Sequence, residues 1–149
     1  MTTASTDRTT ANLATVTEIY AAFGRGDVPT ILDKVGPDCR WESWAKNYAQ
    51  KADVPYLRPR IGPAGVGEFF AVLAGLQMRD FQVLDLMGND RQVTAEVVID
   101  FTTPTGGRLR DEELHLWTFD ENQKLVRFRH YIDTAKHIAA NTGEDTTAL

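Results

Sequence analysis

Apolar residues in the first half of the chain recur every three or four positions, the spacing that places them on one face of a helix. The segments with this spacing are 13–23, 28–35 and 63–75. Gly24 and Gly26 follow the first segment, Asp27 is a suitable N-cap for the second, and Pro63 stands at the start of the third. The pattern therefore predicts three helices before residue 76.

Alternation of apolar and polar residues, which is typical of strands, prevails after residue 80. Turn-forming sequences at 88–90 and 104–107 divide this part of the chain into segments. The predicted strands are 39–44, 81–87, 93–101, 108–119 and 125–132. A short helix is predicted at 135–140 with Asp133 as its cap, and capping also accounts for the i, i+4 pair of Asp133 and His137.

Helices followed by an antiparallel meander predict an α+β fold in which the helices cover one face of a curved sheet. We expect a single domain over residues 11–140. Residues 1–10 contain five threonines and residues 141–149 are mostly polar, so both ends are predicted to be disordered tails. Residues 45–62 show no period and contain two prolines, and a loop of this length is a candidate lid over a site.

Composition and charge exclude several classes of function. The chain has 149 residues, of which 42% are hydrophobic and 25% are charged, and these values are typical of one globular domain. Its formal net charge is −5 and it has no basic run, which disfavours nucleic-acid binding. No apolar run reaches the length of a membrane span, so no membrane partner is expected. Cys39 is the single cysteine, which favours a cytoplasmic location.

The last two predicted strands place two histidines side by side. If 121–124 is a four-residue loop, antiparallel pairing sets His115 opposite His130, and opposed residues point to the same face. The other residues on that face are Trp117, Phe119, Val126, Phe128 and Ile132. The opposite face carries Leu114, Leu116, Thr118, Arg127, Arg129 and Tyr131. This mixed face is too apolar to be fully exposed to solvent, which predicts a homodimer with this face as its interface.

Two adjacent imidazoles in a poorly solvated cavity cannot both hold a proton without mutual repulsion. We therefore expect His130 to act as a general base and His115 as an acid or oxyanion donor. The alternative is that each histidine is a core residue hydrogen-bonded to a neighbour. A metal site of Glu113, His115 and His130 is less favoured than ion pairing of Glu113 with Arg108 or Arg110, so no metal or other cofactor is expected.

Further residues are candidates for contact with a small hydrophobic molecule in the same cavity. These candidates are Tyr20, Trp41, Ser43, Glu96, Trp117 and Phe128. The tryptophans and the phenylalanine are the expected apolar walls. Glu96 belongs to the site if the mixed face of strand 93–101 lines the cavity, a choice that the pattern leaves open. Arg58 and Arg60 either clamp an anionic ligand or are solvated.

Several of these segments resemble the nuclear transport factor 2-like, or ketosteroid isomerase-like, superfamily. Residues 21–27 (AAFGRGD) resemble its early signature of a helix, Gly-Asp and a second helix, and residues 62–70 (GPAGVGEFF) are similar to its third helix. Residues 105–119 and 124–134 resemble the SnoaL-like branch. The resemblance implies a cone-shaped, cystatin-like α+β barrel with the sheet wrapped on N-terminal helices. It also implies a pocket between sheet and helices, and commonly a homodimer.

The branches of this superfamily differ at their catalytic positions. The positions of the ketosteroid isomerase residues fall at Ile19, Ser43 and His115. The positions of the epoxide hydrolase triad fall near Glu96, Val98 and His130. Neither set of residue types is retained, whereas the histidine and the acid–base aspartate of SnoaL-like polyketide cyclases correspond to His115 and His130.

The resemblance therefore favours a cofactor-independent acid–base enzyme of isomerase, cyclase, hydrolase or lyase type that acts on a hydrophobic, carbonyl-bearing metabolite. The superfamily also contains proteins that only bind ligands. Two alternatives thus stay open: a non-catalytic ligand-binding module, and a structural dimer in which side chains fill the cone.

Overall fold

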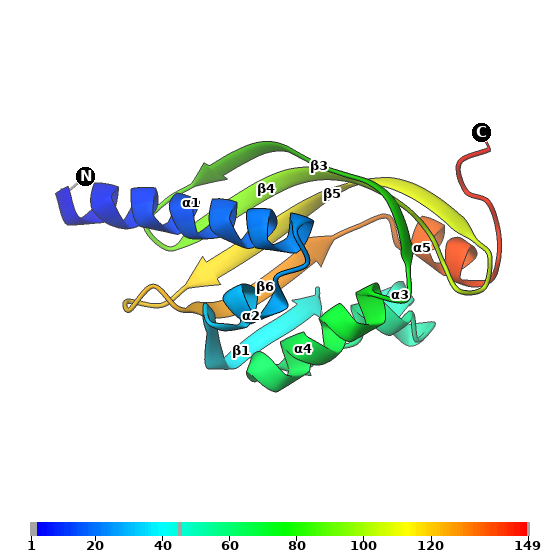
Figure 1. Ribbon diagram of the computed structural model, residues 1–149, viewed down its shortest axis with the longest axis horizontal. Helices are drawn as coiled ribbons and strands as arrows, with labels where there is room; N and C mark the ends of the chain where they lie inside the picture. Colours follow the sequence, from blue (N-terminus) through cyan, green and yellow to red (C-terminus); the bar gives the residue numbers. More distant parts are fainter. Residues whose placement is uncertain (1–2, 45, 149) are drawn as a thin grey trace.

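A curved, open sheet of six strands forms one layer of the molecule, and the helices lie against one face of it (Figure 1). The computed structural model describes residues 3–44 and 46–148. The strands are β1 (Val35–Ser43), β2 (Arg60–Ile61), β3 (Gln77–Gly88), β4 (Gln92–Thr102), β5 (Arg108–Phe119) and β6 (Leu125–Tyr131). They are arranged in the order β2-β1-β6-β5-β4-β3. Strands β1 and β6 run parallel and the other neighbours antiparallel, which confirms the expected α+β class with a mixed sheet.

The helices cover the two halves of the sheet. They are α1 (Thr3–Gly24), α2 (Val28–Leu32), α3 (Tyr48–Lys51), α4 (Gly62–Leu73) and α5 (Thr134–Asn141), with a 3-10 turn, η1 (Pro55–Leu57). Helix α1 packs against β3 and β4, α4 packs against β1, and α5 packs against β5. Buried apolar side chains fill the space between these layers, among them Ile19, Trp41, Val66, Phe101 and Leu109. No helix among the described residues is both long and apolar enough to cross a membrane.

The helix boundaries follow from the residues expected to set them. The side chain of Asp27 accepts a hydrogen bond from Thr30 N at 3.2 Å, and that of Asp133 accepts one from Lys136 N at 3.1 Å, so both predicted N-caps are confirmed. Gly62, at the start of α4, has a φ of +69°, and a Cβ there would lie 2.5 Å from Pro37 O. This close approach explains why a glycine begins α4.

Several boundaries differ from the prediction. Helix α1 begins at Thr3, so the predicted disorder of residues 1–10 is wrong from that residue onward. Residues 6–8 are exposed, and this part of α1 therefore has no apolar face by which it could be recognised. Val35 begins β1 instead of ending the second helix. Residues 48–61 contain α3, η1 and β2 instead of one long loop. Each of these elements is too short to produce a recognisable helix or strand period in the sequence.

The chain after α5 is attached to the sheet and does not form the predicted tail. Arg108 N donates a hydrogen bond to Glu144 O at 2.9 Å, and Thr146 N donates one to Arg108 O at 2.9 Å. The prediction of disorder over 141–149 is therefore wrong for this part. Main-chain hydrogen bonds of polar residues leave no apolar pattern in the sequence, which is why the attachment was not expected.

The hairpin of β5 and β6 confirms the register on which the histidine pair depends. His115 opposes His130 and Trp117 opposes Phe128. The register shifts near the loop, so that Phe119 opposes Leu125, and Val126 is 38% exposed instead of lying on the core face. Leu125 N donates to the carbonyl of Lys34, beside β1, and this bond holds Leu125 in the core position that Val126 was expected to take.

Candidate active site

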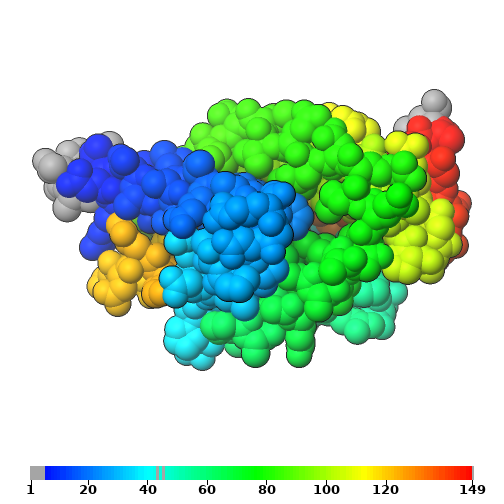
Figure 2. Space-filling view, in the orientation of Figure 1, coloured from blue at the N-terminus to red at the C-terminus, as the bar shows by residue number. Residues whose placement is uncertain are grey.

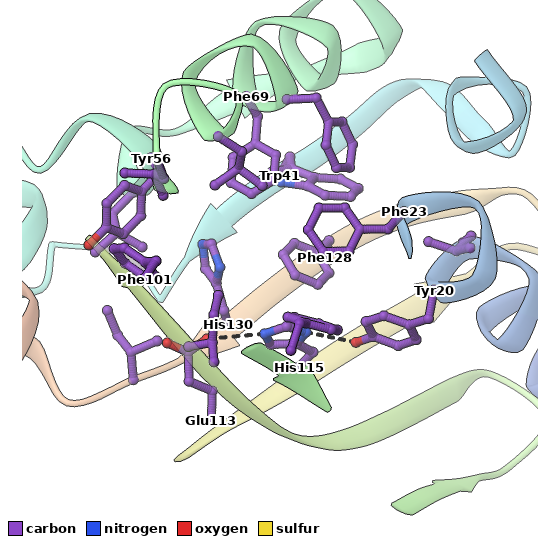
Figure 3. Close-up of a pocket in the computed structure, with 18 of the residues that line it drawn as sticks. Tyr20, Phe23, Trp41, Tyr56, Phe69, Phe101, Glu113, His115, Phe128 and His130 are labelled. Atoms are coloured by element: carbon purple, nitrogen blue, oxygen red, sulfur yellow. Dashed lines mark hydrogen bonds and ion pairs between the residues drawn. The ribbon is translucent and has the colours of Figure 1, made fainter. Parts of the chain in front are cut away.

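The sheet and the helices α1 and α4 enclose a cavity lined mainly by aromatic side chains (Figure 3). Its empty space is about 620 Å³, including the space at its mouth. Trp41, Trp117 and Phe128, the three expected apolar walls, all line it. The ring centroid of Phe128 lies 4.3 Å from that of Trp41 and 4.3 Å from that of Trp117. The parallel pairing of β1 with β6 brings Trp41 to this position, directly beside Phe128.

Partly buried apolar side chains surround the entrance of the cavity. Phe23 from α1, Phe70 from α4 and Phe81 from β3 line the cavity and remain partly exposed. The ring centroid of Phe23 lies 5.0 Å from that of Phe81 and 6.1 Å from that of Phe70. Figure 2 shows a hollow in the surface where the blue end of α1 meets the green end of α4 and start of β3. A ligand that enters there meets apolar rings first, which favours a hydrophobic molecule.

The polar groups of the cavity come largely from β5 and β6. His115 and His130 both line it, with ring centroids 6.1 Å apart. Both residues are buried, His115 with 7% and His130 with 6% of its surface exposed. The expected placement of two histidines together on the core face is therefore confirmed.

A chain of hydrogen bonds engages both ring nitrogens of His115, as the dashed lines of Figure 3 show for two of its members. Trp117 Nε1 donates to Tyr20 Oη at 3.1 Å, and Tyr20 Oη lies 2.7 Å from His115 Nδ1. On the other side, His115 Nε2 lies 3.2 Å from Glu113 Oε1. A carboxylate only accepts hydrogen bonds, so Nε2 carries the hydrogen and donates, and in the neutral ring Nδ1 accepts from Tyr20. Burial raises the pKa of Tyr20, which keeps its phenol protonated.

His130 differs from His115 in the state of its Nε2 atom. His130 Nε2 is buried and has no hydrogen-bond partner in the part of the chain that the structure describes. Burial, and next to it the proximity of His115, lower the pKa of His130 to about 3, so its ring is neutral at physiological pH. A buried polar atom without a partner costs roughly 1–3 kcal/mol. A ligand with a suitable polar atom would remove that cost.

A third histidine, which the sequence indicated only as part of a helix cap, belongs to the same polar group. His137 Nε2 lies 2.9 Å from Glu113 Oε2 and 2.9 Å from Asp111 Oδ2, and its Nδ1 lies 2.8 Å from Tyr56 Oη. Burial opposes a charge on His137, but the hydrogen bonds to Asp111 and Glu113 outweigh it and raise its pKa to about 9. His137 is therefore a buried imidazolium at neutral pH.

Asp111, Glu113 and His137 are also a set of possible metal ligands, with one ligand atom of each within 4.8 Å of the others. The set differs from Glu113, His115 and His130, which the sequence suggested. The hydrogen on His137 Nε2 bridges both carboxylates, so a divalent ion would have to displace this proton. The ion pairs of His137 with Asp111 and Glu113 are sufficient to account for the positions of all three side chains.

Other residues expected at the site lie elsewhere. Glu96 is exposed on the face of β4 that points away from the cavity, which corrects its assignment. Ala95 opposes His115 in the sheet, and alternation along β4 therefore turns Glu96 to the other face. Ser43 pairs with His130 at the end of β1, but its side chain lies outside the described part of the structure.

Arg58 and Arg60, for which an anion clamp and solvation were both left open, make local contacts. Arg58 Nε lies 2.7 Å from Asp53 Oδ1, and Arg60 Nη2 donates to Pro55 O at 3.1 Å. Neither side chain lines the cavity.

Tyr56 and His137 were missed because they come from short covering elements, η1 and α5. A usable signal was nevertheless present in β5. Asp111, Glu113 and His115 alternate onto the core face, and three buried polar groups in a row need partners from the elements that cover them. Tyr20, in contrast, was among the candidates and contacts His115 directly.

Comparisons with proteins of known structure agree with this architecture. An NTF2-like protein from Burkholderia xenovorans superimposes with a TM-score of 0.72 at 19% identity, covering 89% of this chain and 96% of the other. A LEH-like epoxide hydrolase from M. tuberculosis gives 0.66 at 13% identity, covering 87% of each chain. The epoxide hydrolase/cyclase-like enzyme SalBIII, which has a role in pyran ring formation in the polyether salinomycin, gives 0.65 at 16% identity, covering 85% and 94%. At these identities the likeness shows the fold alone.

Sequence comparison gives the family. A search of curated protein sequences finds no significant match. The model of the SnoaL-like domain matches residues 16–128, which is most of the chain and includes α2, β1 and α4 as well as most of the β5–β6 hairpin. The family match and the NTF2-like neighbours agree with the resemblance noted in the sequence. The chain therefore belongs to the SnoaL-like family and has the NTF2-like fold.

Proposed function

We propose that the protein is a cofactor-independent acid–base enzyme that acts on a small, hydrophobic, carbonyl-bearing molecule, in a reaction of isomerase, cyclase, hydrolase or lyase type. The observation that carries this proposal is the free Nε2 of His130, which is buried in a cavity with aromatic walls. A neutral imidazole with a free nitrogen is suited to accept a proton from a molecule bound beside it. His130 is accordingly the proposed general base.

The lowered pKa of His130 determines which substrates it can deprotonate. In the empty cavity burial disfavours the imidazolium, so His130 is a weak base. Removal of a proton from a substrate leaves a negative charge beside the ring, and this opposite charge favours the imidazolium. Proton transfer is therefore favoured for a substrate whose deprotonated form is an oxyanion close to His130, such as the enolate of a carbonyl compound.

His115 takes part under a stricter condition. Both of its nitrogens are engaged, one with Tyr20 and the other with Glu113. It can serve as an acid or an oxyanion donor only if a substrate oxygen replaces one of these partners. The same engagement favours a second candidate function, a ligand-binding module in which the histidines orient a ligand without chemistry.

The family and the structural neighbours support the enzymatic proposal. A LEH-like epoxide hydrolase and an epoxide hydrolase/cyclase-like enzyme share the fold. Epoxide opening and ring formation both require proton transfer to or from oxygen. Proton transfer to and from a bound molecule is likewise the role proposed for His130.

The test begins with a thermal-shift screen of hydrophobic carbonyl compounds and epoxides, because a ligand that binds the native state raises its melting temperature. Compounds that bind are then assayed for turnover with wild type, His130→Gln and Glu96→Gln. We expect His130→Gln to retain binding and lose about 10²- to 10⁴-fold in turnover. Glu96→Gln is the matched control and should behave as wild type, because Glu96 lies on the other face of the sheet.

The other outcomes distinguish between an enzyme and a binding module. Compounds that bind tightly without conversion by the wild type would favour the binding module. Turnover that is equal in His130→Gln and wild type would contradict the assignment of His130 as the base.

A further inference from the structure

Glu113 places a carboxylate at an apolar cavity, where burial by itself would favour the protonated acid. The residue is only 6% exposed, yet each of its oxygens faces an imidazole. Glu113 Oε1 lies 3.2 Å from His115 Nε2, and Oε2 lies 2.9 Å from His137 Nε2. The carboxylate is therefore held between a histidine of β5 and one that comes from α5.

We infer that His137 is a positioning residue of this site: it provides the countercharge that keeps Glu113 ionised, and through Glu113 it orients His115 toward Tyr20. The catalytic relevance of this arrangement rests on the proposed function. The charge arrangement itself can be measured without any substrate.

The contacts of His137 favour its charged form. Two carboxylates, Asp111 and Glu113, share its Nε2, and in the imidazolium its Nδ1 donates to Tyr56 Oη. Lys136 Nζ lies 3.6 Å from Asp111 Oδ1 and balances part of the second negative charge. Burial would raise the pKa of Glu113, but the hydrogen bonds from His115 and His137 hold it well below its usual range.

The ionisation of Glu113 determines which atoms donate and which accept in the hydrogen bonds from Glu113 through His115 to Tyr20. An ionised Glu113 accepts the hydrogen of His115 Nε2, so in the neutral His115 ring Nδ1 accepts from the phenol of Tyr20. A protonated Glu113 could instead donate to His115 Nε2. The ring hydrogen would then lie on Nδ1 and point at Tyr20 Oη, which reverses the chain of donors.

Three further titratable groups near Glu113 stay neutral at pH 7. Tyr20 from α1 and Tyr56 from η1 both have a pKa raised by burial, and His130 from β6 has a lowered one, also through burial. Raising the pH from 7 to 10 therefore removes the charge of His137 without ionising either tyrosine.

The experiment is NMR of protein labelled with ¹³C at glutamate and aspartate carboxyls and with ¹⁵N in the histidine rings. In the wild type we expect His137 to carry hydrogens on both nitrogens at pH 7 and to lose one near pH 9. Glu113 should stay ionised from pH 8 down to pH 4. In His137→Gln we expect Glu113 to take up a proton at a pH about two units higher than in the wild type, since it then faces the buried carboxylate of Asp111 with Lys136 as the cation left beside that carboxylate.

Two further variants separate charge from shape. His137→Lys restores a cation and should return the protonation midpoint of Glu113 toward that of the wild type. Tyr56→Phe removes the hydrogen bond to His137 Nδ1 but leaves the charge, so Glu113 should stay ionised.

Several results would overturn the inference, and the first two need no variant to fold. They are a neutral His137 at pH 7 in the wild type, and a wild-type Glu113 that titrates near its ordinary value of 4.5. An unchanged Glu113 midpoint in folded His137→Gln would do the same. If Glu113 behaves as expected while His130→Gln keeps full turnover, the proposed function fails and this inference stands. The reverse result removes the inference and leaves the role of His130.

Discussion

Tyr20 Oη lies 2.7 Å from His115 Nδ1, although the two residues are 95 positions apart in the sequence. The same oxygen accepts a hydrogen bond from Trp117 Nε1 at 3.1 Å. One phenol thus ties the first helix to β5 and satisfies two buried groups of the cavity wall. The relationship links stability to the site, because loss of one hydroxyl leaves both groups without that partner.

We predict that Tyr20→Phe destabilises the protein by about 1–3 kcal/mol, since the ring is kept while Trp117 Nε1 and His115 Nδ1 lose their partner. Tyr48→Phe is the matched control, because Tyr48 is 72% exposed and should tolerate the change. Urea denaturation at pH 7 measures both. Equal stability of the two variants would show that the Tyr20 hydroxyl makes no net contribution.

The pKa values of His137 and His130 are shifted in opposite directions, and we therefore predict that the free energy of unfolding is highest near pH 6.5. The pKa of His137 is raised from 6.5 to about 9, so its stabilisation is complete below pH 6.5 and is lost as the pH rises through 9. The pKa of His130 is lowered from 6.5 to about 3, so its stabilisation is present above pH 6.5 and is lost as the pH falls toward 3. At about 1.4 kcal/mol per pKa unit, the alkaline limb amounts to roughly 3 kcal/mol and the whole acid limb to roughly 5 kcal/mol.

Denaturation curves recorded from pH 5 to pH 10 test this dependence. His137→Gln should flatten the alkaline limb and leave the acid limb, while His130→Gln should do the opposite. A wild-type curve that stays level from pH 6.5 to pH 10 would contradict a charged His137 in the folded protein.

We predict that Gly107→Ala is strongly destabilising, because a Cβ at Gly107 would overlap the carbonyl oxygen of Ala140 in α5. Overpacking of this kind costs about 1–3 kcal/mol, or several degrees of melting temperature for a chain of this size. Gly24→Ala is the control, since a Cβ there meets nothing within 4 Å. Calorimetry compares the two, and a Gly107→Ala variant as stable as the control would show that α5 is not held against the β4–β5 turn.

The outer face of the sheet remains the predicted dimer interface. Leu114 is 45% and Tyr131 37% exposed on it, and Arg127 Nε and Arg129 Nε are buried without a hydrogen-bond partner among the described residues. We predict that Leu116→Glu yields monomers, because a charge would be buried in the contact. Light scattering measures the mass, with Ile61→Glu as the control at the exposed β2 edge. A dimer that persists in Leu116→Glu would exclude this face.

The histidine pair could be predicted because it depends on local rules. Alternation along a strand and the length of one loop suffice to set His115 opposite His130, and the structure keeps this register even though Val126 is displaced. Trp117 and Phe128 followed from the same register. The family signature extended the prediction to the curved sheet and the helices that cover it.

The partners of the polar groups could not be predicted in the same way. His137 reaches Asp111 and Glu113 from α5, and Tyr56 reaches His137 from η1. The positions of these two elements depend on tertiary packing and not on a period. His137 looked like part of a helix cap because Asp133 does cap α5. Glu96 was left open because β4 carries apolar residues on both faces, including Val98, and only its pairing with β5 shows which face is inside.

Contact between His130 Nε2 and a ligand is tested most directly by NMR of ring-¹⁵N histidine during titration with a compound from the thermal-shift screen. Before addition, His130 should show a neutral ring that does not titrate between pH 8 and pH 5. On addition, the Nε2 resonance of His130 should move in proportion to the bound fraction, while both nitrogens of His137 stay protonated. A ligand that saturates the cavity and leaves His130 Nε2 unchanged, or a His130 that titrates near pH 6.5 on its own, would contradict its role as the proton acceptor.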